Sequence, residues 1–406
     1  MTKGLSLDKF YQYLLIFLAF LMPLTVSGAN TVIVIICFIW LFSGDYKLKL
    51  TQIIGSKVLI ASLIFFALHV VGLIWTEDLL WGLEIVHKMW YFGLLFPIFY
   101  TIVKEPYIKY YLFAFILAIA FTATLSFLVW FGILDPEHGF FGLLKADNAS
   151  HPNIFMSHIS YNPILTIAIY LLLHEIFFNV NLMKLKFFLY SFFSVVFSIN
   201  MFITGGRAGQ IMFFSMIAIL IFQFFNNEKI KALIVVSILI PGIFFTAYQT
   251  SSIFEARVNS VISDITIFSD NQYTSTGLRI TFAVNSWEII KKNPFIGVGS
   301  GDFPAEYKKV NLINTPSLPN ATNPHNMYVL ILVQLGLIGL VSLLSIFYFQ
   351  IKQSFLNKNR LRRDLGLALP LLFLVIMFSD SYLLGHYTTL MYIFFSSFLY
   401  KNFEKN

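Results

Sequence analysis

Apolar residues occur along this chain in long runs that are mostly separated by short polar segments. Twelve of these runs approach the length of about 20 residues that a helix needs to cross a bilayer. The pattern therefore predicts an all-α fold with about twelve membrane-spanning helices. The second and the last run are short, which allows a tilted or partly re-entrant arrangement. The runs cover residues 11–28, 30–44, 57–75, 86–103, 109–132, 154–175, 186–204, 208–226, 231–249, 326–350, 365–381 and 385–400.

Basic residues are concentrated in every second connection between these runs. If the N-terminus is cytoplasmic, the even-numbered connections and both tails hold 18 of the 27 Lys and Arg residues. Short cytoplasmic loops are enriched in Lys and Arg, so the pattern predicts that both ends of the chain are cytoplasmic. Adding or removing one run would reverse this alternation. The 18 residues are Lys3, Lys9, Lys47, Lys49, Lys57, Lys104, Lys109, Lys184, Lys186, Lys229, Lys231, Lys352, Lys358, Arg360, Arg362, Arg363, Lys401 and Lys405.

Two segments on the opposite, periplasmic side are long, at about 133–153 and 250–325. Within the second, apolar residues fall at helical spacing in 253–268 and 277–292, which predicts two helices. We therefore expect a helical periplasmic loop subdomain in 250–325, preceded by spans one to nine in 1–249 and followed by spans ten to twelve in 326–406.

Composition supports a membrane protein. Hydrophobic residues make up 58% of the 406 residues and charged residues only 12%, whereas soluble domains carry about 25% charged residues. The net charge of +7 is spread over short loops and forms no basic patch, so we expect no nucleic-acid partner. The basic start and the apolar run after it resemble a signal peptide, but a second run follows at once, which favours an uncleaved first span.

A turn between the seventh and eighth runs has the sequence Thr204-Gly205-Gly206-Arg207-Ala208-Gly209. Glycines such as Gly206 permit close backbone approach and positive φ angles. The planar guanidinium of Arg207, fixed in such a turn, is suited to bidentate contacts with a phosphate. An arginine that snorkels to lipid head groups is an equally good explanation of the spacing alone.

Arg279 follows Thr276-Gly277-Leu278 at the start of the second loop helix. An arginine in a first turn opposes the helix dipole, but it can join the free backbone N–H groups in binding an anion. A solvated surface arginine is the alternative. The glycine-rich segment 293–303 that follows is neither a dinucleotide fingerprint nor a phosphate loop, and it is interpreted as a flexible connection whose Asp302 caps a short helix near 304–309.

His325 lies in Asn323-Pro324-His325-Asn326, where the long loop enters the tenth run. A helix N-terminus disfavours positive charge, so a neutral imidazole, which can accept a proton as a general base does, is expected there. A polar interfacial histidine without a chemical role is the alternative. Asn326 is a further candidate beside it.

Other polar residues near the outer ends of the runs are secondary candidates for the lining of a site. They include His158, for which structural polar contacts are the simpler explanation, and Lys88. No metal-binding pattern or nucleophile elbow occurs, and we expect no metal or cofactor. The remaining candidates are His151, Asn153, Tyr161 and Asn162 around the sixth run, Glu84 and His87 beside Lys88, and Asp380 and His386 near the last turn.

These motifs occur together in one order that resembles a known family. They are similar to motifs of the O-antigen ligase and O-antigen polymerase superfamily. In chain order the motifs are Gly-Gly-Arg-Ala-Gly, Gly-Leu-Arg, Asn-Pro-Phe-Ile-Gly-Val-Gly and Asn-Pro-His-Asn, followed by Gln334-Leu335-Gly336-Leu337-Ile338-Gly339. The resemblance is strongest over 195–345. The turn reads Gly-Gly-Arg where many members have Ser-Arg.

The resemblance implies glycan transfer at the periplasmic face of the bacterial inner membrane, by an all-helical fold of the broad GT-C type that needs no metal or nucleotide. It implies an undecaprenyl-pyrophosphate-linked glycan as donor and, for the ligase branch, lipid A–core as acceptor. Residue by residue, His325 matches the family's general base, and Arg207 and Arg279 match the arginines that hold the pyrophosphate. The order of spans favours a ligase. A repeat-unit polymerase is the alternative in the same class.

A transporter or flippase for lipid-linked glycans is the alternative in a different class. It would require charged residues at mid-membrane and two matching halves, and the runs show neither. The sequence therefore favours an inverting, metal-independent transferase, and it predicts that Arg207, Arg279 and His325 converge on one cavity.

Overall fold

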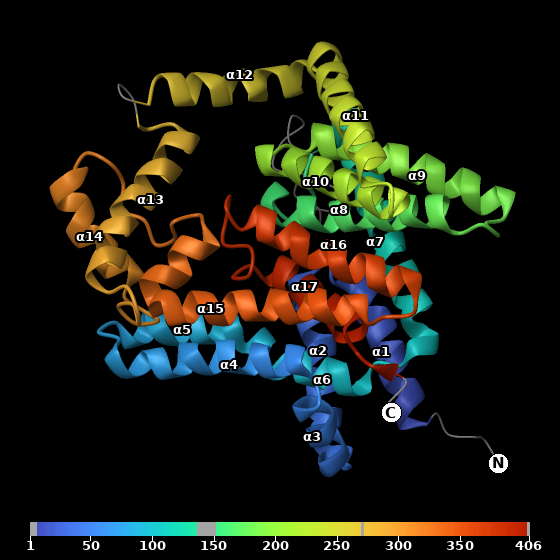
Figure 1. Ribbon diagram of the computed structural model, residues 1–406, viewed down its shortest axis with the longest axis horizontal. Helices are drawn as coiled ribbons and strands as arrows, with labels where there is room; N and C mark the ends of the chain where they lie inside the picture. Colours follow the sequence, from blue (N-terminus) through green and yellow to red (C-terminus); the bar gives the residue numbers. More distant parts are fainter. Residues whose placement is uncertain (1–5, 136–151, 269–271, 404–406) are drawn as a thin grey trace.

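A computed structural model describes residues 6–135, 152–268 and 272–403, including the backbone but not the side chains of residues 207 and 253. All regular secondary structure in these ranges is helical. Several of the longer helices lie along the longest axis of the molecule (Figure 1). The helices of the long loop, α12 to α14, are at one end of this bundle, and both chain termini are at the other.

Each of the twelve apolar runs corresponds to a helix or to a group of consecutive helices. Three of these groups contain short 3₁₀ or π segments, and a short helix α3 (Tyr46–Ile54) follows the second run at an angle of 114°. The helices are α1 (Leu7–Leu21), α2 (Val26–Phe42), α4 (Lys57–Val71) with η1 (Gly72–Trp75), α5 (Leu79–Trp90) with η2 (Tyr91–Leu95) and α6 (Phe96–Ile102), η3 (Glu105–Tyr107) with α7 (Ile108–Trp130), α8 (His158–Phe178), α9 (Lys184–Ile203), α10 (Arg207–Phe225), α11 (Lys229–Thr250), α15 (Met327–Phe355), α16 (Arg360–Ile376) and α17 (His386–Leu399).

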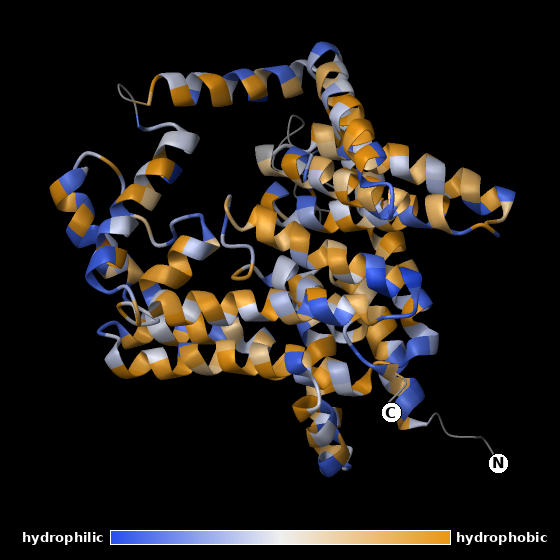
Figure 2. Ribbon diagram, viewed as in Figure 1, coloured by the Kyte–Doolittle hydropathy of each residue, from blue (hydrophilic) through white to orange (hydrophobic). Residues whose placement is uncertain are grey.

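Eight of these segments in the described ranges are long and apolar enough to cross a membrane, and the bent pair of α2 and α3 would make nine. The chain is therefore a multi-pass membrane protein. The helices α1, α16 and α17 have 15, 17 and 14 residues, which is shorter than a usual span, so the count of twelve stays a prediction. Hydrophobic residues dominate the bundle, and hydrophilic ones are concentrated at helix ends and in α12, α13 and α14 (Figure 2).

The short helix α17 lies in the centre of the bundle. All of its residues from Thr388 to Leu399 are buried, and it packs on α6, α8 and α16. Two of its polar side chains are bonded to Gln350 of α15: Ser396 Oγ accepts a hydrogen bond from Gln350 Nε2 at 3.1 Å, and the Tyr392 hydroxyl donates one to Gln350 Oε1 at 2.7 Å. Because α17 contacts protein on all sides, it does not need the fully apolar surface of a lipid-facing helix.

The long loop forms three helices, α12 (Ser252–Thr266), α13 (Ser275–Lys292) and α14 (Phe303–Asn314). The first two agree with the helices predicted at 253–268 and 277–292. Thr276 Oγ1 donates a hydrogen bond to Asp264 Oδ2 at 2.8 Å and thereby connects α12 and α13. The ring of Phe282 on α13 packs edge-on against Tyr307 on α14, with centroids 5.6 Å apart.

The glycine-rich segment after α13 is held against α15 by backbone hydrogen bonds. The N–H groups of Val298 and Gly299 donate to the carbonyl oxygens of Val333 and Gln334 at 2.9 and 3.0 Å. These contacts occur where α15 is interrupted at Gly336, which has φ 59° and ψ −156°. The expectation of a flexible connection is therefore wrong, because the free backbone groups at the helix break pair with the loop.

Asp302 stands at the N-cap position of α14, but its side chain caps no N–H of that helix. Its carboxylate instead accepts hydrogen bonds from the backbone N–H groups of Glu77 and Asp78, at 2.8 to 3.0 Å. The predicted side-chain cap is therefore wrong. Asp302 fastens the loop subdomain to the turn before α5, since a buried carboxylate needs several donors.

We expect Gly336→Ala to destabilise the protein strongly. A Cβ at this position would lie 2.3 Å from the carbonyl carbon of Phe295, and the backbone angles of Gly336 are accessible to almost no other residue, so the cost is roughly 3 kcal/mol or more. The measurement is the thermal unfolding of purified protein in detergent. The control is Gly242→Ala, where a Cβ meets nothing within 4 Å; an equal loss of stability in both variants would contradict this explanation.

Candidate functional site

A polar cavity of about 320 Å³ lies between the bundle and the loop subdomain. Helices α8, α10, α12 and α13 and the connection from α16 to α17 contribute to its walls. Segments that are far apart in the sequence therefore meet around one space. The lining residues are His158, Ile159, Asn162, Gly206, Ala208, Arg257, Ser275, Arg279, Ser379, Asp380 and Tyr382.

One wall is the turn between α9 and α10. The side-chain amides of Asn153 and Asn162 donate hydrogen bonds to the carbonyl oxygens of Thr204 and Gly205, at 3.0 and 2.9 Å. Gly206 has φ 82°, and a Cβ there would lie 2.5 Å from Cδ2 of His158. Gly205 and Gly206 both have positive φ angles. They thus have the role predicted from the sequence, which is to permit positive φ and close contact with α8.

Arg207 is the first residue of α10, directly between the lining residues Gly206 and Ala208. Its side chain lies outside the part of the protein that the structure describes. The backbone position is compatible with the predicted approach to the cavity. The start of α10 also contributes the positive end of a helix dipole, which favours an anion.

His325 is held at the junction between the loop and α15 in a left-handed backbone conformation, with φ 51°. Its N–H donates to Asn323 Oδ1 at 3.0 Å, and its ring stacks on Phe282 of α13 at a centroid distance of 6.3 Å. Positive φ is unfavourable for residues with a Cβ. These contacts keep the imidazole in one orientation in spite of that cost.

The Nδ1 atom of His325 lies 3.2 and 3.3 Å from the two carboxylate oxygens of Asp380. Asp380 is in the connection between α16 and α17, and its side chain is only 10% exposed. Asp380 Oδ1 also accepts a hydrogen bond from the N–H of Ser381 at 2.7 Å. Although burial raises the pKa of Asp380, the hydrogen bonds from His325 and from the Ser381 N–H and the charge of Arg279 together lower it, so Asp380 is ionised.

Further hydrogen bonds connect the start of α15 to the end of α16. Asn326 Oδ1 caps α15 by accepting from the Val329 N–H at 3.1 Å, and its amide donates to the Phe378 carbonyl oxygen at 3.2 Å. The N–H of Met327 donates to the carbonyl oxygen of Met377 at 2.9 Å. Asn326 is therefore a structural residue that keeps His325 beside Asp380.

This geometry assigns different roles to the two ring nitrogens of His325. A carboxylate on Nδ1 favours the tautomer that carries its proton there, so Nε2 has the free lone pair. Nε2 makes no hydrogen bond with any residue that the structure describes, and the side chain is 40% exposed. Nε2 of His325 can thus accept a proton, as expected of a general base. His325 itself is not among the residues that line the cavity, and it reaches the cavity wall through its contact with Asp380.

Arg279 lines the cavity from α13, where it precedes Phe282 by three residues and so lies on the same face. It is the fifth residue of α13, because the helix begins at Ser275. The prediction that Arg279 is in the first turn is therefore wrong by one residue. Ser275, the first residue of α13, lines the same cavity as Arg279.

The remaining candidates divide between two places. Gly206 and His158 line the cavity described above, whereas Lys88 lines a separate cavity of about 520 Å³ together with His87 and His386. His151 is outside the described residues. Among the described residues, no three His, Cys, Asp or Glu side chains are grouped as a metal site would require.

Sequence reasoning did not find two features of the cavity. It named Asp380 only as a polar lining residue and did not connect it with His325, 55 positions away. It also missed Arg257 of α12, which lines the cavity beside Arg279. The available signal was that Arg257 lies in the predicted helix 253–268, which directly precedes the helix of Arg279. A multivalent anion needs several cations to hold it, so a second arginine near Arg279 could have been proposed for the same site.

Residues 192–344 match the protein-family model described as O-Antigen ligase. This match confirms the resemblance to the O-antigen ligase and polymerase superfamily and supports a glycosyl-transfer function of the ligase or polymerase type. No curated protein matches the chain. The matched range contains Gly206, Arg207, Arg279 and His325, and it ends before Asp380.

We expect Asp380→Asn to lower the free energy of unfolding near neutral pH by about 1–3 kcal/mol, because it removes the charged partner of His325. The pKa of Asp380 is lowered in the folded protein, so its contribution is complete above the unfolded pKa of about 3.9 and is lost as pH falls through the lower folded value. Thermal unfolding in detergent at several pH values tests this.

Wild type and Asp380→Asn should therefore converge in stability as the solution is acidified below about pH 4. Glu84→Gln, on exposed α5 surface, is the matched control for the removal of one carboxylate and should follow the wild type. A constant difference between wild type and Asp380→Asn at all pH values would refute the role of the ionised carboxylate.

Proposed function

We propose that the protein is an O-antigen ligase, which transfers a glycan from undecaprenyl pyrophosphate to a hydroxyl group of lipid A–core. The observation that carries this proposal is the pairing of His325 with Asp380 at the edge of a cavity that Arg279 lines. A proton acceptor and fixed positive charge in one place are what transfer from a diphosphate donor needs.

The donor pyrophosphate would occupy the cavity between α10, α12 and α13. Arg279 and Arg257 line it, and Arg207 at the start of α10 is assigned to the same role from its sequence motif. One guanidinium group can donate two parallel hydrogen bonds to the oxygens of a phosphate, and the N-terminus of α10 adds free N–H groups as further donors. This arrangement is suited to the charge that accumulates on a departing pyrophosphate.

In the reaction, Nε2 of His325 takes the proton of the acceptor hydroxyl, and the hydroxyl oxygen forms a bond with the anomeric carbon of the donor sugar. The bond between that carbon and the pyrophosphate oxygen breaks, and its electron pair leaves with the pyrophosphate. Direct displacement inverts the anomeric centre. Asp380 stabilises the imidazolium that forms, and the arginines stabilise the leaving group, so the reaction needs no metal.

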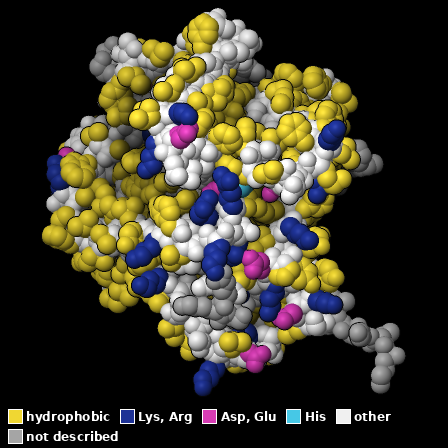
Figure 3. Space-filling model, turned by 45° about the vertical axis from the view of Figure 1, so that its right-hand side comes forward, with side chains coloured by type: hydrophobic (Ala, Val, Ile, Leu, Met, Phe, Trp, Pro, Cys, Tyr) yellow, Lys and Arg dark blue, Asp and Glu magenta, His cyan; other side chains and the backbone are white. Residues whose placement is uncertain are grey.

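The charge distribution of the protein supports one orientation in the membrane. Lys and Arg side chains gather on the face that includes the end of the bundle with the chain termini (Figure 3). Cytoplasmic ends are rich in these residues, which supports a location in the bacterial inner membrane with both termini cytoplasmic. The cavity at the opposite end would then face the periplasm, where lipid-linked glycans and lipid A–core are both present.

A repeat-unit polymerase remains the alternative within the same class, because it would use the same donor chemistry and differ only in the acceptor. Purified protein should be given a radiolabelled lipid-linked glycan together with lipid A–core. Transfer of label to lipid A–core is the expected result. Extension of the lipid-linked glycan without that transfer would assign the protein to the polymerases, and movement of the glycan across vesicle membranes without bond formation would assign it to the transporters.

We expect His325→Ala to reduce the rate of glycan transfer by roughly 10²- to 10⁴-fold, which is the usual contribution of a general base. Donor binding should be retained, since the imidazole acts on the acceptor. His87→Ala is the matched control, because His87 is exposed and lines the separate cavity. Transfer at the wild-type rate in His325→Ala would remove the proposed base.

We expect Arg279→Ala to reduce the rate by about 10²-fold or more, as for the loss of one charged group that stabilises the transition state. Arg279→Lys should restore only part of the rate, because an ammonium group cannot form bidentate contacts with phosphate. The control is Lys292→Ala, an exposed cation at the end of the same helix. Equal rates for Arg279→Ala and Lys292→Ala would contradict a specific role of Arg279.

A further inference from the structure

A second polar pocket, of about 310 Å³, lies at the opposite end of the bundle from the candidate site. It is formed where α4 begins, where α15 ends and where the chain continues beyond α17. The helix α15 extends between the two places over 29 residues, which corresponds to roughly 40 Å at the rise of an α-helix. This pocket is therefore independent of the proposed transfer reaction.

The pocket is lined by five cationic residues, and none of its described lining residues is Asp or Glu. Lys57 and Lys352 form no ion pair within the part of the chain that the structure describes, whereas Arg362 is 2.7 Å from Glu105. Lys57 is also the first residue of α4, where the helix dipole adds positive potential. The five are Lys57, Lys352, Lys358, Arg362 and Lys401.

Lys401 is almost completely buried at the floor of this pocket, with 5% of its surface exposed. Its Nζ donates hydrogen bonds to the carbonyl oxygens of Thr101 and Val103, both at 3.1 Å. Burial, assisted by the charge of Lys104 and opposed by that of Asp8, lowers the pKa of Lys401 to about 7. An anion in the pocket would restore its charged form, because a nearby opposite charge favours ionisation.

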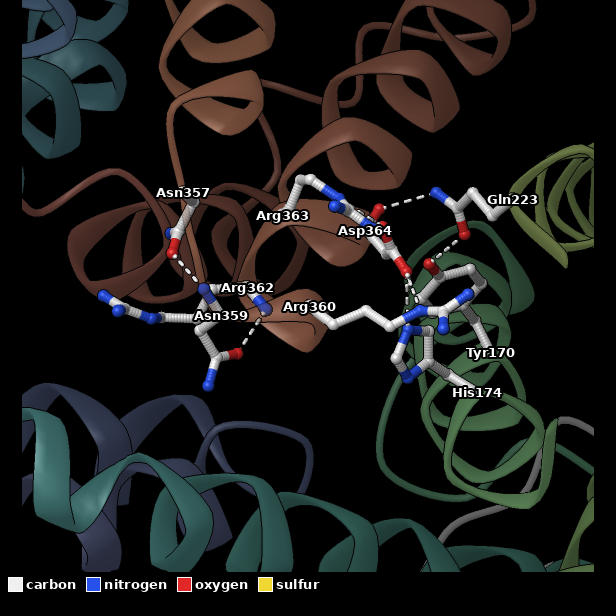
Figure 4. A network of polar contacts seen from close by, with 9 residues as sticks. All are labelled: Tyr170, His174, Gln223, Asn357, Asn359, Arg360, Arg362, Arg363 and Asp364. Atoms are coloured by element: carbon white, nitrogen blue, oxygen red, sulfur yellow. Dashed lines mark hydrogen bonds and ion pairs between the residues drawn. The ribbon is translucent and has the colours of Figure 1, made fainter. Parts of the chain in front are cut away.

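The charges of two neighbouring arginines at this end are balanced by a carboxylate of the protein itself. Figure 4 shows Arg360 and Arg363 directed toward Asp364, with ion-pair distances of 3.4 and 3.0 Å. Asp364 is also 3.1 Å from Nε2 of the buried His174. The protein thus supplies its own carboxylate to these cations but supplies none among the described residues that line the pocket. Lys57 and Lys352 differ from these arginines, because no carboxylate among the described residues forms an ion pair with either lysine.

An apolar groove of about 660 Å³ adjoins the pocket, and Arg362 lines both. The groove lies against α7, α8 and α9, and Phe113, Leu117 and Phe193 are among its walls. A soluble anion would use only the pocket. A molecule with an anionic group and hydrocarbon chains would use both, which points to a lipid.

We propose that this pocket binds the phosphate-bearing head group of an anionic phospholipid, with acyl chains along the adjoining groove. Lys57, Lys352 and Lys401 bind the phosphate, and Arg362 marks the boundary between head group and chains. The bound lipid connects the start of α4 with the ends of α15 and α17, so it stabilises the bundle at the end opposite to His325 and Asp380.

The test uses full-length protein in neutral detergent and follows the thermal unfolding midpoint as cardiolipin, phosphatidylcholine or inorganic phosphate is titrated. Cardiolipin should raise the midpoint, and the other two should have little effect. Lys57→Ala/Lys352→Ala should bind cardiolipin roughly 30-fold more weakly, about fivefold for each lysine. Lys47→Ala/Lys184→Ala loses the same charge from exposed residues outside the pocket and should bind like the wild type.

Several results would overturn the proposal. Equal shifts with phosphatidylcholine, or equal losses in the two double variants, would show that no specific site exists. The same shift with inorganic phosphate at the concentration that suffices for cardiolipin would assign the pocket to a soluble anion. If the alanine pair unfolds at a lower temperature without lipid, Lys57→Gln/Lys352→Gln, which keeps most of the side-chain packing, is measured in its place.

Discussion

The contact between the imidazole of His325 and the carboxylate of Asp380 is the interaction on which the candidate site depends. It joins the end of a long polar loop to the connection between α16 and α17, and it determines which nitrogen of the ring is free to accept a proton. Hydrogen bonds from Asn326 and Met327 to the end of α16 keep the two residues together. A buried carboxylate and a histidine with positive φ each carry a cost, and their contact offsets part of both costs.

The position of the loop helices depends on the break in α15. At Gly336 the helix leaves backbone groups unpaired inside the protein, and the segment after α13 pairs with them. Asp302 adds a second attachment at the turn before α5. Through these attachments α13 is fixed over the bundle, with Arg279 and Phe282 directed toward the cavity and His325. The position of Arg279, whose charge the proposed reaction needs, thus depends on backbone contacts between the segment after α13 and α15.

Hydropathy alone predicted the existence of the helices of the bundle, because each must bury about 20 apolar residues or match the bilayer. It was less accurate for their ends, as for α1, which is predicted at 11–28 and lies at Leu7–Leu21. It did not predict which helices are neighbours. The helix α17, with 14 residues, is shorter than an ordinary span, and its residues from Thr388 to Leu399 are all buried in the protein. The glycines around Arg207 and the motif around His325 indicated a site, because such patterns have a local physical cause. The pairing of His325 with Asp380 and the approach of Arg257 have no local signal, since both result from the packing of distant segments.

The central position of α17 has a consequence for biosynthesis. A ribosome produces this helix after all the other described helices, yet α6, α8 and α16 close around it. Until α17 has been inserted, the middle of the bundle is open, and the polar groups that it will satisfy, such as the amide of Gln350, must be solvated by water, lipid head groups or the insertion machinery. The central packing of the bundle is therefore completed only when the last of its described helices has been inserted.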